Sequence, residues 1–308
     1  MYVLVATDGS REAWAAIRLL RRVAHRSAVD VTVLAVVPRG IQSPEHLPDL
    51  LAPVVDRRSI ATEAMLRAVE FLNGSGIRAR GLIAEGRAGA EIVSAAVYED
   101  SDLVVVGSGS NSVLAHLLGS VSTHVLNHSP CSVMVVHSLA SDLKPRRLLV
   151  ATDGGPQWGA ELHLLERLID PRRTELKVVS VAATDPPQVM VSPGAHAPLM
   201  DDHERERLRK RAERAVDLAC DQLSERGFSV SSAVASGPVA LTLEDLTKEW
   251  SAALTVVGSR GLHGAERIML GSVGQTLARR APATLVVREE QGASITIDDQ
   301  RELEHSSR

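Results

Sequence analysis

A glycine-rich stretch in the C-terminal half of the chain has the residue types of a phosphate-binding loop. Gly258, Gly261 and Gly264 follow an apolar run, and Gly271-Ser272 then opens a segment whose apolar residues have helical spacing. Glycine lets the backbone approach a ligand closely. Serine at a helix start is a typical N-cap, so we expect Ser272 to cap this helix. The unpartnered N–H groups of a first helical turn carry the positive end of the dipole, which favours a phosphate here.

A near-copy of this stretch lies in the N-terminal half. Gly107 and Gly119-Ser120 take the equivalent positions, but the two glycines are 12 residues apart where the second copy has 13. Ser110 stands where the second copy has Gly261. A hydrogen bond to a charged group contributes roughly 1.5–3 kcal/mol, so losing one weakens binding about ten- to a hundredfold. We therefore expect the second copy to bind a phosphate-bearing ligand more tightly than the first.

The two copies belong to a tandem duplication. The sequence "YVLVATDGSREAW" opens the chain and "RLLVATDGGPQW" recurs later, which aligns Asp8 with Asp153 in the same order as the glycine loops. A repeat of this length predicts two similar units. We assign four segments: a first domain over 1–138, a polar linker over 139–146, a second domain over 147–289, and a polar tail, expected to be disordered, over 290–308.

Strands and helices alternate in both halves. In the first half we predict strands over 2–7, 31–37, 77–84, 102–107 and 131–136, and helices over 11–25, 55–73, 89–98 and 119–129. In the second half we predict strands over 148–152, 175–182, 228–235, 254–258 and 284–288, and helices over 157–169, 202–226, 239–249 and 271–280. Continuous Val and Leu runs are typical of parallel strands buried on both faces. The pattern predicts an α/β fold of two tandem, Rossmann-like, five-stranded parallel-sheet domains with helices on both faces.

The repeated residues fall where such a sheet binds ligands, beyond the carboxyl ends of its strands. Asp8 and Asp153 follow the first strand of each half, while Gly107 and Gly258 end the fourth. We expect each Asp to lie close to the glycine loop of its own half. A buried Asp at this point could also do no more than cap the helix that follows it.

Composition narrows the classes of function. The 308 residues carry a net charge of −4 with both signs interleaved, and only 2% are aromatic. Single-stranded nucleic acid is bound by aromatic platforms in basic grooves, so we do not expect nucleic-acid binding. No apolar run is long enough to cross a membrane, and the chain opens without a signal-peptide pattern. The two cysteines lie in different halves, which fits a reducing cytoplasm rather than a disulfide framework.

Together these motifs resemble the universal stress protein family. The pattern Gly-x2-Gly-x9-Gly-Ser in the second half is similar to that family's ATP-binding signature. The sequences "VATDGS", "SDLVVVGS", "LGSVSTHVLNHSPCSVMVV" and "LGSVGQTLARRAPATLVV" are also similar to the family, and the likeness covers 1–137 and 146–289. The resemblance implies a fold like that of the adenine-nucleotide alpha hydrolases and ATP as ligand, with or without Mg²⁺.

The resemblance also implies a role for individual residues. In the second half Asp153 would hydrogen-bond adenine, the backbone of Val181 would meet the base, and the glycine loop and helix start would hold ribose and phosphates. The full set there is Ala151, Asp153, Val181, Gly258, Arg260, Gly261, Gly271, Ser272, Val273 and Gly274. The weaker first-half set is Ala6, Asp8, Val36, Gly107, Gly119, Ser120, Val121 and Ser122.

Two other motifs have more ordinary explanations. Gly107-x-Gly109 followed by Ser112 imitates a dinucleotide fingerprint, but it follows the fourth strand and lacks the last glycine. His124 and His128 are spaced for one helix face. They could hold a metal, but no Glu lies between them and no third ligand is evident, so we expect surface or interface residues and no metal site.

The motifs and the family resemblance together imply an ATP-binding regulatory protein of the stress response, not an enzyme, with little or no turnover. Neither glycine loop contains Lys, and no catalytic base accompanies it. A slow ATPase, a nucleotide-free interaction scaffold with degenerate sites, and an adenylating or amide-forming ligase are the alternatives; the ligase would need a Ser-Gly-Gly-x-Asp-Ser loop after the first strand. The resemblance also implies that the apolar last strands of the two halves pair with each other within the chain, and chains could dimerise further.

Overall fold

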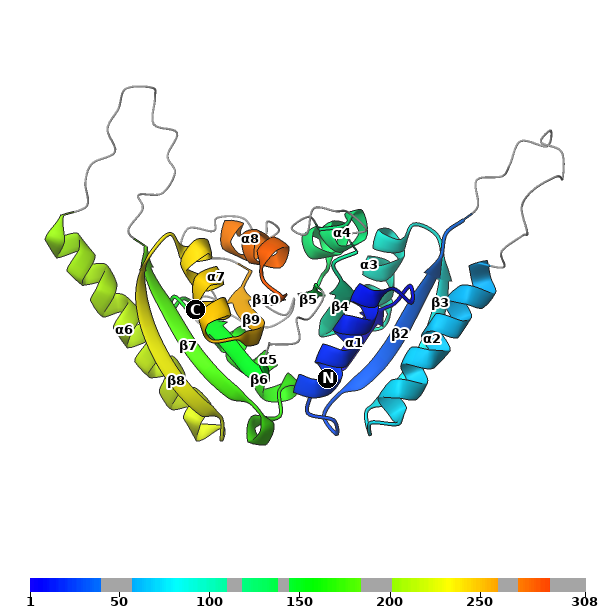
Figure 1. Ribbon diagram of the computed structural model, residues 1–308, viewed down its shortest axis with the longest axis horizontal. Coiled ribbons are helices and arrows are strands. Elements are labelled where there is room, and N and C mark those ends of the chain that lie inside the picture. Colours follow the sequence, from blue (N-terminus) through cyan, green and yellow to red (C-terminus); the bar gives the residue numbers. More distant parts are fainter. Residues whose placement is uncertain (40–56, 110–117, 138–143, 184–200, 260–270, 289–308) are drawn as a thin grey trace, which may run out of the picture.

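The computed structural model describes residues 1–39, 57–109, 118–137, 144–183, 201–259 and 271–288. Within these ranges, ten strands form one sheet in the order β3-β2-β1-β4-β5-β10-β9-β6-β7-β8. Each half contributes five strands that are parallel within the half. The two halves lie side by side with their last strands at the centre (Figure 1). The predicted tail, 290–308, lies outside the described residues.

The first half runs from β1 to β5 with one helix between successive strands. Its elements are β1 Tyr2–Ala6, α1 Arg11–Val23, β2 Asp30–Val37, α2 Arg57–Asn73, β3 Arg78–Glu85, α3 Ala88–Tyr98, β4 Leu103–Gly107, α4 Ser120–His128 and β5 Ser132–Val136. They match the predicted segments to within a few residues at each end, because buried apolar runs and helical spacing both depend on local sequence.

The second half repeats this plan. Its elements are β6 Lys144–Ala151, α5 Trp158–Leu168, a short 3-10 helix η1 Pro171–Arg173, β7 Glu175–Ala183, α6 Asp202–Glu225, β8 Ser229–Gly237, α7 Val239–Glu249, β9 Ala252–Gly258, α8 Ser272–Arg280 and β10 Ala283–Val287. β6 starts at Lys144, within the segment that the sequence assigned to the linker.

The seam between the halves is the antiparallel pair β5–β10. Val133 lies opposite Val286 and Val136 opposite Ala283 in this ladder, and all five residues of each strand are buried. This is the pairing of last strands within the chain that the sequence predicts. Since β5 and β10 are both used here, the outermost strands of the sheet among the described residues are β3 and β8.

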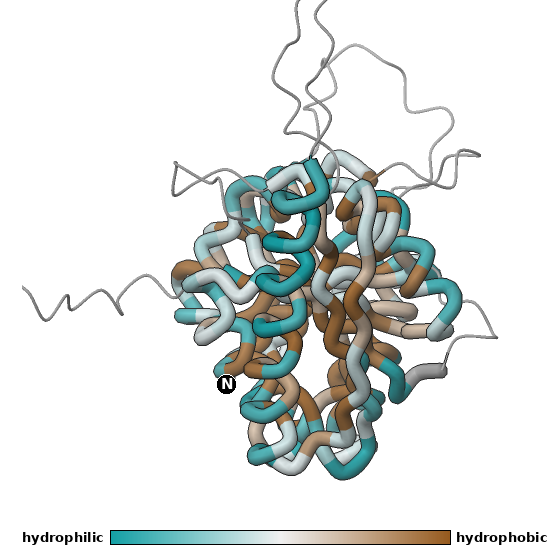
Figure 2. Tube along the Cα trace, turned by 90° about the vertical axis from the view of Figure 1, so that its left-hand side faces the viewer, coloured by the Kyte–Doolittle hydropathy of each residue, from teal (hydrophilic) through white to brown (hydrophobic). Residues whose placement is uncertain are grey.

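Two apolar layers cover the two faces of the sheet. Side chains alternate along the strands, so that Val3 and Val5 contribute to one cluster and Leu4 to the other. The first cluster contains the buried faces of α1, α2, α5 and α6, and the second those of α3, α4, α7 and α8. The outer helix α6 is largely hydrophilic where it faces the viewer in Figure 2. The prediction of helices on both faces is confirmed.

Candidate functional site

The turn that follows β1 is fixed by its own side chains. The Thr7 hydroxyl accepts a hydrogen bond from the Gly9 backbone N–H at 3.2 Å, and Asp8 Oδ1 accepts one from the Ser10 N–H at 2.9 Å. Gly9 has a φ of +78°, a conformation that glycine adopts without strain. Asp8 is exposed rather than buried, and it lies two residues beyond the end of β1 at Ala6. One oxygen of its carboxylate holds the turn.

The second half builds the same turn with almost the same distances. Thr152 Oγ1 accepts from the Gly154 N–H at 3.1 Å, and Asp153 Oδ1 accepts from the Gly155 N–H at 2.8 Å. Gly154 again has a positive φ, +68°. Asp153 is half-buried.

In the first half Ser10 is the N-cap of α1 and accepts from the Ala13 N–H. Asp8 therefore holds the turn, while Ser10 is the residue that caps the helix.

The helices that follow the glycine loops begin without a side-chain cap. Gly119 is the N-cap of α4 and Gly271 that of α8, and neither start has a side-chain hydrogen bond. The prediction that Ser272 is the N-cap is wrong: it is the first helical residue, because extended backbone precedes it at Gly271. Ser120 holds the same place in α4. Glycine has no side chain that could cap them, and the first-turn N–H groups of both helices have no partner within their own helix.

Both loops are closed by one backbone hydrogen bond at their base. The Gly119 N–H donates to the Ser108 carbonyl at 2.7 Å, and the Gly271 N–H donates to the Ser259 carbonyl at 2.8 Å. The chain thus returns to the end of the fourth strand before the helix starts. This contact brings the residues after β4 and β9 next to the N-termini of α4 and α8. Ser110, Ser112, Arg260 and Gly261, which the sequence placed within the loops, lie outside the described residues.

The glycines at the base of the first loop are required by the protein itself. A Cβ atom at Gly107 would lie 2.7 Å from the backbone N of Ala13, and one at Gly119 would lie 2.7 Å from the carbonyl O of Gly109. Contacts this short do not occur between a real Cβ and backbone atoms. Gly107 therefore lets α1 approach the end of β4, in addition to lining the site.

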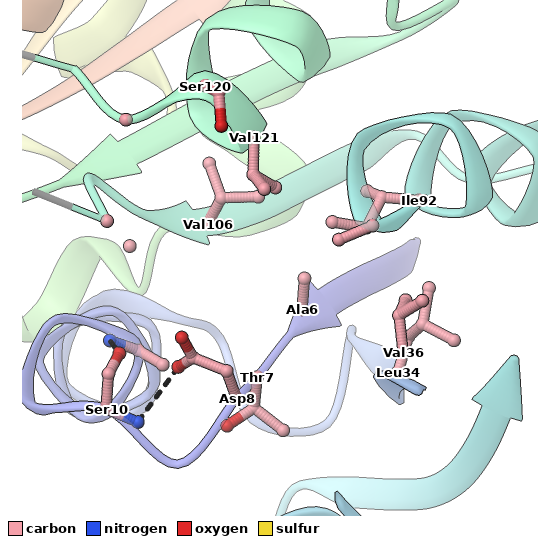
Figure 3. Close-up of a pocket in the computed structure, with 15 residues that line it drawn as sticks. Ala6, Thr7, Asp8, Ser10, Leu34, Val36, Ile92, Val106, Ser120 and Val121 are labelled. Atoms are coloured by element: carbon pink, nitrogen blue, oxygen red, sulfur yellow. Dashed lines mark hydrogen bonds between the residues drawn. The ribbon is translucent and has the colours of Figure 1, made fainter. Parts of the chain in front are cut away.

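A cavity of about 170 Å³ lies between these elements in the first half. Ala6, Val36, Val106, Val121 and Ile92 face one another across it, with Asp8 at one end and Ser120 at the rim (Figure 3). Its lining residues are Ala6, Thr7, Asp8, Ser10, Ala13, Leu34, Val36, Ala88, Ile92, Val106, Gly107, Gly109, Gly119, Ser120 and Val121. Sites for small molecules usually enclose about 300–1,000 Å³, so the space within the described walls is smaller than is typical, and those walls are mostly apolar.

Seven of the eight first-half candidates line this cavity. The eighth, Ser122, is buried behind it, where its hydroxyl is within 2.8 Å of the Ser108 carbonyl and 3.0 Å of the Gly119 carbonyl. These contacts tie α4 to the base of the loop. The Ser122 side chain is thus used inside the protein, and only its backbone N–H, in the first turn of α4, is placed to meet a ligand.

The described second-half candidates occupy the matching positions. Ala151 ends β6, Val181 lies in β7 and Gly258 ends β9, while Val273 and Gly274 follow in the first turn of α8. The base of the loop differs in its side chains. Gln157, which precedes α5, is buried and donates from Nε2 to the Ser259 hydroxyl at 3.3 Å.

A buried carboxyl near the second site was missed from the sequence. Glu161 in the first turn of α5 is 4% exposed, and its Oε2 has no hydrogen-bond partner among the described residues. Burial, with a contribution from the charge of Asp153, raises the pKa of Glu161 to about 8. The group is therefore mostly protonated at neutral pH. The alignment of the two halves could have indicated this group, because it places Glu161 opposite Ala16, which is buried in α1.

The histidine pair of α4 makes contacts within its own half. The rings of His124 and His128 stack with their centroids 4.2 Å apart, and His128 Nδ1 donates to the His124 carbonyl at 2.8 Å. A Cβ atom at Gly89 of α3 would lie 2.9 Å from His124, so this ring packs closely between α3 and α4. Among the described residues no group of three metal-ligating side chains is found. Within the same ranges, no helix has the length and apolarity to span a bilayer.

The chain belongs to the universal stress protein family, whose model matches residues 1–137 and 144–288. A universal stress protein of Mycobacterium tuberculosis (strain ATCC 25618 / H37Rv) is 30% identical over 196 residues, which are 62% of this chain and 63% of that protein. One from Mycolicibacterium smegmatis is 26% identical over 291 residues, 92% of this chain and 96% of that protein. The chain thus spans less than two thirds of the M. tuberculosis relative and nearly all of the M. smegmatis one.

A solved structure shows the same fold along most of the chain. The crystal structure of a universal stress protein from Archaeoglobus fulgidus DSM 4304 superposes with a TM-score of 0.64 and 21% identity, covering 93% of this chain and 98% of that one. The α/β architecture of two joined units is therefore shared with a member of the family.

Proposed function

We propose that this chain is a regulatory protein of the stress response that binds ATP, with or without Mg²⁺, and turns it over slowly or not at all. One site would lie in each half, at the carboxyl ends of the strands, and the second would bind more tightly. Membership of the family supports the general class.

The observation that carries the proposal is the cavity of the first half, with a carboxylate at one end and an uncapped helix start at its rim. Apolar side chains of Val36, Val106 and Ile92 suit the faces of a purine base. Asp8 has one carboxylate oxygen in the turn, and its other oxygen could accept a hydrogen bond from a base or ribose. The N–H groups of Ser120 and Val121 would meet the phosphates.

The second site would use the same backbone with its own side chains. Asp153, Val181 and the first turn of α8 take the equivalent places. Gly261 would follow the ribose and phosphates, and Arg260 would add a positive charge. The extra residue and extra glycine of this loop are the reason to rank the second site above the first.

Binding rather than catalysis fits the residues of both sites. Phosphoryl transfer needs a placed cation and a charged clamp on the moving phosphate. Neither glycine loop contains Lys. We therefore expect turnover no faster than a slow background, and a homodimer, if formed, would use a surface other than the β5 and β10 edges, because these pair within the chain.

The test is to purify the protein, denature it, and measure released adenine nucleotide, followed by calorimetry with added ATP on the emptied protein. We expect released nucleotide or measurable ATP binding, and its loss at the tighter site in Gly271→Asp combined with Gly261→Val. Protein that carries no nucleotide and ignores ATP would contradict the proposal and favour a nucleotide-free scaffold. Steady ATP hydrolysis that disappears in Asp153→Ala would favour an ATPase instead.

A further inference from the structure

The C-terminal end of α4 is held by a residue from the other half of the chain. Arg288 is the first residue after β10, and its Nη2 donates to the Leu126 carbonyl at 2.7 Å. Its backbone N–H donates to the Ser132 hydroxyl at the start of β5, at 3.1 Å. Leu126 lies in the last turn of α4, where carbonyls have no partner within the helix. A guanidinium from the second half therefore meets the negative end of the first half's helix.

The reverse contact holds the C-terminal end of α8. His137 is the first residue after β5, and its Nε2 lies 2.8 Å from the Ala278 carbonyl. Because a carbonyl oxygen only accepts, Nε2 is the nitrogen that carries the proton and donates. The His137 backbone N–H also donates to the Pro282 carbonyl at 2.9 Å. A residue of the first half thus meets the last turn of the second half's helix.

The two contacts are equivalent by position, although their side chains differ. His137 and Arg288 each directly follow the strand that forms the seam. Leu126 and Ala278 are each the third residue from the end of their helix. The same contact is therefore built twice across the β5–β10 pair, once with imidazole and once with guanidinium. A duplicated contact made by two different donors indicates that a donor at this point matters to the helix.

The helices held in this way are those whose N-termini face the candidate phosphate sites. Each has nine residues, a length at which an isolated helix is marginal in water, so tertiary contacts decide how firmly it is placed. Neither has a side-chain cap at its start. A donor at the far end satisfies a free carbonyl and, for Arg288, favours the helix dipole whose positive end meets the ligand.

We propose that each half positions the phosphate-binding helix of the other, with Arg288 as a positioning residue for the first site and His137 for the second. The assignment of α4 and α8 to phosphate rests on the proposed function. The contacts of Arg288 with α4 and of His137 with α8 do not depend on the proposed function. A change after β10 should therefore affect the first half's site, although the residue belongs to the second half.

The test compares the two sites separately. Gly271→Asp leaves the first site to be measured, and Gly119→Asp leaves the second. In these backgrounds we expect Arg288→Ala to weaken ATP binding at the first site by roughly three- to tenfold with little effect on the second, and His137→Ala to do the reverse. Arg288→Lys and His137→Gln keep a donor and should recover at least half of the lost affinity.

Amide hydrogen exchange on the full-length protein tests, without any nucleotide, whether Arg288 stabilises α4 and His137 stabilises α8. We expect Arg288→Ala to speed exchange over 120–128 and not over 272–280, and His137→Ala to show the opposite pattern. Loss of affinity or protection in the variant's own half, or equal changes in both halves, would overturn the proposal. If the unaltered protein binds no ATP, the proposed function fails. The exchange pattern alone then supports or overturns the stabilisation of each helix by the residue from the other half.

Discussion

The two halves of the molecule keep one backbone design and differ in the side chains around it. The turns after β1 and β6 have the same two side-chain hydrogen bonds, and the donor–acceptor distances differ by 0.1 Å at Asp8 and Asp153. The loop bases are closed by the same backbone bond, 2.7 Å in one half and 2.8 Å in the other. Duplication therefore preserved the parts of the site that depend on backbone geometry.

The two halves differ in the side chains that lie next to the candidate sites. α5 buries Glu161 where α1 buries Ala16. Gln157 donates to the Ser259 hydroxyl, whereas the aligned residue of the first half is the carboxylate Glu12. One fold thus supports two chemical environments, and unequal behaviour of the halves is the expected result.

The largest effect should come from the buried carboxyl of the second half. Glu161 has a pKa of about 8 in the folded protein, against 4.5 for the ordinary carboxyl. Folded protein keeps the proton between these pH values while unfolded protein releases it, so the free energy of unfolding falls as pH rises through this window. We expect Glu161→Gln to stabilise the protein by about 2–4 kcal/mol at pH 8 and hardly at all at pH 4.5.

Urea unfolding across pH 4.5–8 measures this effect. Glu166→Gln in the same helix is the matched control, because the Glu166 side chain is 53% exposed and its ion pair with Arg226 should contribute little. A pH slope that survives in Glu161→Gln would show that another group is responsible.

A smaller effect is expected from the carboxylates at the strand ends. Asn keeps an oxygen that can accept from the Ser10 or Gly155 N–H, but it lacks the charge. Asp8→Asn and Asp153→Asn should therefore leave the melting temperature almost unchanged and weaken ATP binding at their own sites by roughly ten- to a hundredfold. Calorimetry with melting curves separates the two effects. If the Asn variants bind ATP as tightly as the unaltered protein, Asp8 and Asp153 do not take part in binding.

An effect of comparable size tests the packing role of the first loop's glycine. A side chain at Gly107 would meet the backbone of Glu12 and Ala13, each 2.7 Å from the added Cβ. We expect Gly107→Val to lower the free energy of unfolding by about 1–3 kcal/mol in ligand-free protein. Gly109→Ala is a useful comparison, because nothing lies within 4 Å of its Cβ, although its φ of +67° adds some strain. If Gly107→Val leaves the free energy of unfolding of ligand-free protein unchanged, glycine at this position is needed for ligand binding alone.

Much of the fold was predictable because its signals are local or repeated. Apolar runs such as Leu103–Gly107 and Ala283–Val287 indicated strands, and the duplicated "VATDG" fixed the equivalence of the halves. The family resemblance, together with the apolar last strands, also predicted the seam. The capping error at Ser272 arose because the sequence marks where a helix starts only to within a residue or two.

The remaining features depend on register and on neighbours distant in sequence. The contacts of His137 and Arg288 follow from the antiparallel pairing of β5 with β10, which sequence spacing does not determine. The burial of Glu161 depends on how α5 packs on β9 and β10. The close approach of Gly107 to α1 likewise appears only when the helix is placed on the sheet.

The most direct test of two unequal sites on one duplicated fold is a calorimetric titration of nucleotide-free protein with ATP. We expect two binding steps, with the tighter one lost in Gly271→Asp and the weaker one lost in Gly119→Asp. A single step abolished equally by either substitution, a tighter site that survives Gly271→Asp, or no binding at all would contradict this expectation.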